Sequence, residues 1–187
     1  MREQRYMEVI LVNEKDEVLG TMEKLEAHEK GLLHRAFSIF VFNSNNELLI
    51  HQRAFGKYHS EGLWTNTCCS HPAPGETVIE AAHRRIQEEM GFDCEMHNAF
   101  HFVYHAELDN NLIEYELDHV VIGHSEQNPQ LNPEEAIDFK WVDLTDLLKD
   151  IQTNPQQYTF WFKTILQKHF DQLTEHMTHE SLQKNHI

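Results

Sequence analysis

Histidine is the residue type that stands out in this chain, with 15 copies among 187 residues. Several lie close in sequence to carboxylates or to a cysteine. Imidazole, carboxylate and thiol groups bind divalent metals and transfer protons near neutral pH. Three others, His97, His101 and His105, recur every four residues as ligands on a helix would, but their segment predicts a strand. We therefore expect no metal site there, and we expect the histidines of residues 168–187 to be solvated.

A second pattern combines arginines and glutamates at helical spacing. Arg84 and Glu88 are four residues apart, as are Arg85 and Glu89, so each pair shares one face of a helix. Such pairs are also typical of an ordinary solvated helix. The spacing alone therefore does not distinguish a functional site from a surface.

Hydrophobic patterning and turn signals place the helices that would position these residues. Thr77 and Glu80 predict a capping box at the start of the Arg/Glu helix, and Gly91 predicts its end. Two further helices are predicted at 144–151 and 155–170.

Strands account for most of the remaining pattern. The nearly continuous apolar segment 36–42 and the segment 47–53 flank the turn at 43–46, which predicts a hairpin. Residues 25–33 are polar and irregular, with Gly31 as a breaker, and we expect no regular element there. Many short strands with few helices indicate an α+β chain or a mixed-sheet sandwich. The other expected strands are 7–12, 18–20, 99–105, 112–122 and 139–142.

Length and composition limit the classes of function. The chain is 40% apolar, enough for one core, which we place in a domain over 1–170 followed by a polar, His-containing tail over 171–187. A net charge of -16 argues against nucleic acid and anionic membranes as partners. We find no membrane-spanning apolar run and no secretory signal, and three cysteines cannot all pair internally. We expect a cytoplasmic monomer.

The helix and the loop before it resemble the Nudix box, G-x5-E-x7-R-E-U-x-E-E-x-G-U, in which U is a bulky aliphatic residue. Two positions differ, because Ser70 stands in place of the first glycine and Arg85 in place of a glutamate. In Nudix hydrolases the carboxylates of this box hold a divalent metal against a diphosphate. An arginine at that position weakens a hydrolytic metal site and suits direct binding of a diphosphate. The matching positions are Glu76, Arg84, Ile86, Glu88, Glu89 and Gly91.

A second motif narrows this resemblance. Residues 64–72, Trp-Thr-Asn-Thr-Cys-Cys-Ser-His-Pro, resemble the W-T-N-x-x-C-x-H-P segment of type 1 isopentenyl-diphosphate Δ-isomerases, which share the Nudix fold and do not hydrolyse. The likeness extends over roughly 7–170. It implies a Nudix-like mixed-sheet α/β/α sandwich that interconverts isopentenyl diphosphate and dimethylallyl diphosphate.

The resemblance also implies a metal site of three imidazoles and two carboxylates. Mixed nitrogen and oxygen ligands suit a tightly bound Mn²⁺ or Zn²⁺, or Fe²⁺. Glu89 matches a position that helps to hold a substrate-linked Mg²⁺. The alternative is a scatter of surface histidines beside a polar strand face. The implied ligands of the tight metal are His28, His34, His71, Glu114 and Glu116.

The resemblance assigns the chemistry to a few other side chains. Cys69 and Glu116 would be the acid/base pair that moves the double bond through a carbocation-like intermediate. Tyr104 would assist the proton transfer and Trp161 would stabilise the cation; the alternative for each is an ordinary buried aromatic residue. The neighbouring Cys68 is expected to pack in the core. The cations implied to bind the diphosphate are Lys24, Arg53, Lys57 and Arg85.

Two other classes of function compete with this hypothesis. One is a Nudix hydrolase acting on a nucleoside-diphosphate derivative, and Arg85 counts against it. The other is a non-catalytic module that binds a diphosphate or a metal. Such a module has no need of a proton-transfer pair such as Cys69 and Glu116.

Overall fold

The central strand, β3 (His34–Phe42), is buried on both faces, which explains its nearly continuous apolar sequence. Phe40 and Phe42 pack into one hydrophobic cluster, whereas Ile39 and Val41 pack into another. This alternation follows from the two-residue period of a strand. The computed structural model describes residues 7–57 and 59–177.

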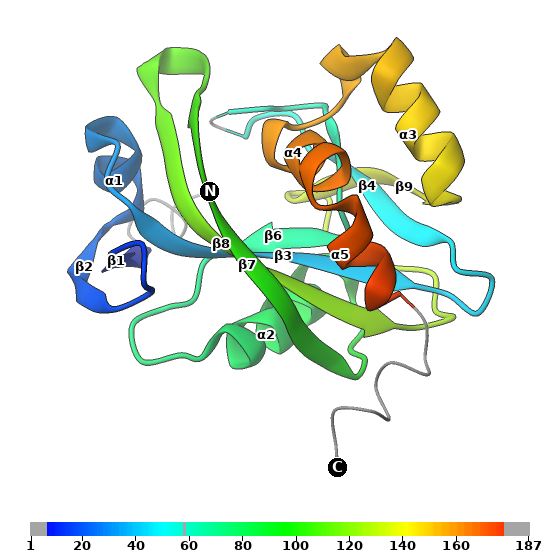
Figure 1. Cartoon of the computed structure of the whole chain (residues 1–187), viewed down its shortest axis with the longest axis horizontal. Coiled ribbons are helices and arrows are strands. Elements are labelled where there is room, and N and C mark those ends of the chain that lie inside the picture. The colour runs from blue at the N-terminus through cyan, green and yellow to red at the C-terminus, as the bar shows by residue number, and fades with distance from the viewer. Residues whose placement is uncertain (1–6, 58, 178–187) are drawn as a thin grey trace.

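The strands of these described residues form one nine-stranded mixed sheet around β3 (Figure 1). β3 pairs in parallel with β8 (Ile113–His124) and antiparallel with β6 (Cys68–Ser70). β8 and β7 (Met96–Glu107) form a long antiparallel hairpin. The remaining strands are β1 (Glu8–Val12), β2 (Val18–Glu23), β4 (Leu48–Arg53), β5 (Trp64–Thr65) and β9 (Ala136–Val142).

One face of the sheet is covered by α2 (Val78–Met90), which carries the Arg/Glu pattern. The predicted capping box is confirmed, because Thr77 Oγ1 accepts from the Glu80 amide at 3.2 Å and Glu80 accepts from the Thr77 amide at 2.9 Å. Gly91 ends the helix at φ 71°, and a Cβ there would lie 2.8 Å from the Gln130 carbonyl oxygen. Only glycine fits that close approach in a left-handed conformation.

The opposite face carries three helices, so the expected α/β/α sandwich is confirmed (Figure 1). These are α3 (Leu144–Thr153), α4 (Phe160–Lys168) and α5 (Phe170–Glu175). The helix predicted at 155–170 is interrupted, because a 3₁₀ turn at Pro155–Gln157 precedes α4. The expected polar tail also folds further than we predicted, since Leu173 of α5 is fully buried in the core. The rest of that tail, from residue 178, lies outside the described residues.

The expectation of an irregular segment at 25–33 is wrong, because α1 (Lys24–Lys30) lies there. Its amphipathic signal is weak, since only Ala27 and His28 are buried. The helix is fixed at its ends instead. Glu23 accepts from the Glu26 amide at 2.9 Å, and Gly31 ends the helix in the left-handed region.

The predicted hairpin of 36–42 and 47–53 forms only next to its turn, where Phe42 pairs with Leu48. Beyond that pair the two strands separate, and Thr67 joins them through its side chain. Thr67 Oγ1 accepts from the Val41 amide at 2.9 Å and donates to the Leu49 carbonyl at 2.7 Å. This bridge satisfies backbone groups that a hairpin would have paired, and it fixes the start of β6. Among the helices of the described residues, none has both the length and the apolar character needed to cross a membrane.

Candidate functional site

Three of the implied metal ligands, all histidines, lie around an oxygen of a fourth, Oε1 of Glu116. The parallel pairing of β3 with β8 places His34 opposite Glu116, while α1 supplies His28 and the segment after β6 supplies His71. The Nε2 atoms of His71, His34 and His28 lie 3.0, 3.4 and 3.7 Å from that oxygen. All four side chains are buried.

The chemistry of this cluster fits a divalent metal. The four ligand atoms all lie within 4.8 Å of one another. Nδ1 of His28 donates to the Lys24 carbonyl at 2.7 Å, and Nδ1 of His34 donates to the Leu32 carbonyl at 2.8 Å. These bonds put the ring proton on Nδ1 and leave Nε2 as the electron-pair donor, as in many protein metal sites.

Glu114, the fifth implied ligand, lies beside this set. Its Oε1 is 3.6 Å from Nε2 of His59, and these two form a second group of potential ligands with His28. Burial and the neighbouring Glu116 raise the pKa of Glu114 well above its usual value. Burial acts on Glu116 in the same direction but is outweighed by three histidines, which hold the pKa of Glu116 well below its usual value.

Tyr104 connects the two carboxylates. The β7–β8 pairing places Tyr104 opposite Glu116, and its hydroxyl lies 2.6 Å from Glu116 Oε2 and 3.1 Å from Glu114 Oε2. Burial and the two carboxylates raise the pKa of Tyr104, so the phenol keeps its proton. It is therefore placed to donate a hydrogen bond to either carboxylate.

Cys69 and Glu116 line the same cavity. Burial raises the pKa of the Cys69 thiol to about 12 despite the nearby charge of Arg53, so the thiol is protonated at neutral pH. The adjacent Cys68 is fully buried in the cluster under α2. The two cysteines differ in this way because successive residues of a strand face opposite sides of the sheet.

Trp161 belongs both to the cavity wall and to a hydrophobic core cluster. Its indole nitrogen donates to Asn66 Oδ1 at 3.1 Å, which fixes the ring. The guanidinium of Arg53 lies 5.3 Å from the ring centroid. The two expectations for Trp161, a core residue and a wall of the site, are thus compatible.

The cations implied to bind a diphosphate all line this cavity. Arg53 is held by its own loop, because Nε donates to the Ser60 carbonyl at 3.0 Å and Nη2 donates to the His59 carbonyl at 3.2 Å. Burial lowers the pKa of Lys24. The four residues are Lys24, Arg53, Lys57 and Arg85.

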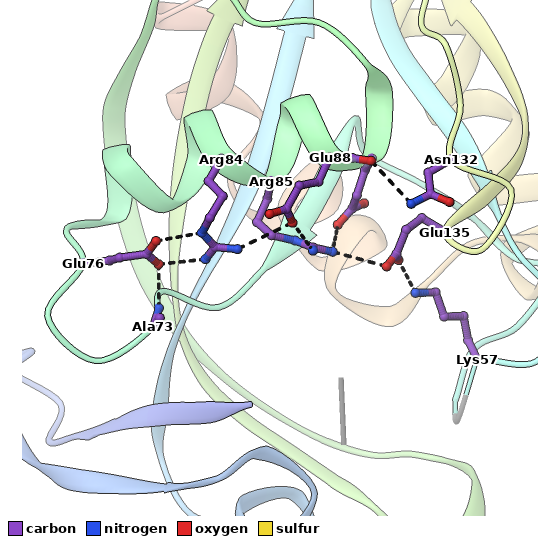
Figure 2. A network of polar contacts seen from close by, with 9 residues as sticks. Lys57, Ala73, Glu76, Arg84, Arg85, Glu88, Asn132 and Glu135 are labelled. Atoms are coloured by element: carbon purple, nitrogen blue, oxygen red, sulfur yellow. Dashed lines mark hydrogen bonds and ion pairs between the residues drawn. The ribbon is translucent and has the colours of Figure 1, made fainter. Parts of the chain in front are cut away.

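Arg85 is the centre of a network of charges along α2 (Figure 2). Its guanidinium lies 2.5 Å from Glu88, 2.5 Å from Glu89 and 3.4 Å from Glu135. Lys57 forms an ion pair with the same Glu135. Glu89, the implied Mg²⁺ ligand, thus belongs to this network rather than to the histidine cluster. Glutamates that would hold a hydrolytic metal in a Nudix box are here paired with an arginine.

Among the buried residues of the cavity that were not predicted from the sequence are His59 and Glu135. His59 lies in the loop between β4 and β5, and Glu135 lies at the end of a turn before β9. Neither position belongs to a periodic element, and a polar residue in a turn is ordinary. A strand was predicted for the segment that contains His97, His101 and His105, and all three lie on β7.

A family model and two solved structures show the class of proteins to which this fold belongs. The model of the NUDIX domain matches residues 32–162. A structure of the Deinococcus radiodurans protein DR0079 aligns with a TM-score of 0.72 at 21% identity, covering 86% of this chain and 98% of that one. The NUDIX domain of Shewanella oneidensis NrtR, complexed with ADP ribose, aligns with a TM-score of 0.57 at 17% identity, covering 84% and 100%. The fold is therefore that of the Nudix class.

Curated relatives define the branch within that class. Isopentenyl-diphosphate Delta-isomerase 2 of Aromatoleum aromaticum is 53% identical over 161 residues, covering 86% of this chain and 85% of the relative. The protein of that name from Photorhabdus laumondii is 52% identical, covering 84% and 89%. The isopentenyl-diphosphate Delta-isomerase of Pectobacterium atrosepticum is 50% identical, covering 83% and 87%. The chain belongs to the isopentenyl-diphosphate Delta-isomerase family, which confirms the resemblance found in residues 64–72.

Proposed function

We propose that this protein interconverts isopentenyl diphosphate and dimethylallyl diphosphate, with Cys69 and Glu116 as the acid/base pair. The observation that carries the proposal is that both side chains line one cavity, which is also lined by four cationic side chains. The names of relatives at about half identity support the same substrate.

The reaction needs two proton-transfer groups. The terminal alkene carbon of isopentenyl diphosphate gains a proton, and the carbon next to the CH₂–O group loses one, so the double bond moves without net change in atoms. A tertiary carbocation-like species lies between the two steps. The Cys69 thiol carries a proton, while the pKa of Glu116 is lowered, so the cavity holds one donor and one acceptor. Each such group contributes on the order of 10²- to 10⁴-fold in rate.

Binding of the substrate depends on local charge, because the chain as a whole has a net charge of -16. Arg53 and Arg85 offer forked donors to a diphosphate, and Lys24 and Lys57 offer compact charges. Substrate-linked Mg²⁺ at Glu89 would neutralise further phosphate charge. Trp161 would face the developing cation, and a desolvated cation–π contact is worth ~2 kcal/mol.

His28, His34, His71 and Glu116, with Glu114 beside them, would hold the tight metal, Mn²⁺ or Zn²⁺. When bound, such an ion would supply positive charge that orients the Glu116 carboxylate and tunes its basicity. Tyr104 holds the other oxygen of Glu116, so the carboxylate is oriented from both sides. That the protein is a cytoplasmic monomer, independent of nucleic acid and membranes, stays a prediction.

The experiment is to load the purified protein with Mn²⁺ or Zn²⁺, add Mg²⁺ and isopentenyl diphosphate, and follow the mixture by phosphorus NMR. We expect dimethylallyl diphosphate with its diphosphate intact. Release of inorganic phosphate, or an unchanged substrate with both metals, would overturn the proposal. Nucleoside-diphosphate derivatives serve as the comparison, because their hydrolysis would indicate the competing Nudix activity.

A further inference from the structure

His59 is a buried histidine of the cavity wall, although it lies in a loop. Its backbone carbonyl accepts from Arg53 Nη2 at 3.2 Å, and its Nδ1 lies 3.2 Å from Ser60 Oγ. The ring stacks on His28 with centroids 6.2 Å apart and meets the Trp161 ring edge-on at 6.0 Å. These contacts turn Nε2 toward Glu114, 3.6 Å away.

The geometry around His59 is that of a metal-binding group. His59, His28 and Glu114 each offer one ligand atom, and the three atoms lie within 4.8 Å of one another. The 3.6 Å between His59 Nε2 and Glu114 Oε1 is a separation that two ligands of one divalent ion can have, since each bond to the ion would be about 2.1 Å long. All three side chains are buried, so the set differs from a chance cluster of solvated acids.

This second set overlaps the first through a single atom. His28 donates Nδ1–H to the Lys24 carbonyl, so only its Nε2 can bind an ion, and that atom belongs to both sets. The two sets would therefore share one ion rather than hold two. His59 and Glu114 both line the cavity, so they would complete the ligand set of that ion on the cavity side.

We propose that His59 is a further metal ligand, which forms with His28 and Glu114 a second donor set on the cavity side of the metal centre. The inference rests on the metal centre proposed above and adds a residue to it. It assigns His59 to the divalent ion directly rather than to the packing of the loop.

Cobalt is a suitable probe, because Co²⁺ takes the place of Zn²⁺ and is paramagnetic. Each histidine bound to Co²⁺ shows a strongly shifted ring N–H signal in proton NMR. The metal-free wild-type protein, His59→Gln and His105→Gln are each titrated with Co²⁺, followed by NMR and by visible absorption. His105 is an exposed histidine of β7 and serves as the matched control. Circular dichroism checks that each variant is folded.

We expect His59→Gln to lose one shifted histidine signal, to keep those of the first set, and to bind Co²⁺ about tenfold more weakly. His105→Gln keeps every signal. If His59→Gln retains all shifted signals and the wild-type affinity, His59 is not a ligand and the inference is overturned. If the wild-type protein itself binds no Co²⁺, the proposed metal centre fails with it. The two failures are therefore distinguishable without any activity assay.

Discussion

Tyr104 and Glu116 lie opposite one another on β7 and β8, and the tyrosine hydroxyl is 2.6 Å from the Glu116 carboxylate. The other oxygen of the same carboxylate faces three histidines. Glu116 is thus shared between a hydrogen-bond donor and a potential metal site. A carboxylate held in this way has one orientation toward the cavity, as the proposed proton transfer with the bound substrate would require.

Tyr104→Phe tests the value of that hydrogen bond. We expect kcat to fall by about 10²-fold, because Glu116 loses its donor on the cavity side while the diphosphate contacts remain. KM and the content of tight metal should stay close to wild type. Steady-state kinetics with metal analysis measures both. A kcat within twofold of wild type would remove Tyr104 from the mechanism.

The adjacent cysteines form a matched pair for the acid/base assignment. Cys69→Ala should lower turnover by at least about 10²-fold and leave the fold intact, because Cys69 lines the cavity. Cys68→Ala should keep turnover and lower the free energy of unfolding by about 1 kcal/mol, because Cys68 packs in the core. Near-normal turnover of Cys69→Ala would contradict the mechanism.

Substitutions of Arg85 and of its neighbour Arg84 distinguish an effect on diphosphate binding from an effect on the helix. Arg85→Ala should raise KM for the substrate about tenfold or more, because it removes a cavity cation and the guanidinium that pairs with Glu89. Arg84 donates two hydrogen bonds of 2.7 Å to Glu76 and is not among the residues that line the cavity. Arg84→Ala should therefore leave KM unchanged. Equal effects of the two substitutions on KM would show that Arg85 acts only through the helix.

The fold was largely predictable because its strands and helices carry strong local signals. β3 is a continuous apolar run, and α2 is marked at both ends by Thr77 and Gly91. α1 was not predicted, because a seven-residue helix with a narrow buried face has no clear period. The separation of β3 from β4 was also not predictable, since it depends on the side chain of Thr67, which is distant in sequence from β3.

His51 should make the stability depend on acidity. Burial, followed by the charge of Arg53, lowers the pKa of His51 to about 4, whereas an unfolded histidine titrates near 6.5. Below pH 6.5 the unfolded chain therefore binds a proton that the folded protein excludes. His51 therefore contributes about 3 kcal/mol to the free energy of unfolding. This contribution is fully present above pH 6.5 and is lost as the pH falls from 6.5 to 4.

The variant His51→Asn isolates this contribution. An asparagine amide can still donate to the Thr67 carbonyl, which accepts from His51 Nδ1 at 3.1 Å, and it does not titrate. Urea unfolding at pH 7, 5.5 and 4 should show that the wild-type protein loses about 3 kcal/mol more than the variant. Parallel losses in the two proteins would show that His51 is not the titrating group.

The residues that line the cavity could be named from the sequence where the family motif includes them, and not elsewhere. Cys69, Glu116 and Tyr104 come from three strands, and no local pattern relates them. His59 and Glu135 occupy loop positions whose place in the cavity depends on the packing of Arg53 and Arg85. The position of the Glu114 carboxylate beside His59 likewise follows from side-chain geometry. The alternation of residues along a strand does not determine it.

Proton NMR of the metal-loaded protein with isopentenyl diphosphate and Mg²⁺ in D₂O tests the central claim most directly. Proton transfer by Cys69 and Glu116, both of which exchange with solvent, predicts dimethylallyl diphosphate that carries deuterium in a methyl group. The diphosphate should remain intact, and Cys69→Ala should form deuterated product at least about 10²-fold more slowly. Product formed without deuterium would contradict proton transfer through exchangeable side chains, and a substrate that stays unchanged would contradict the isomerase itself.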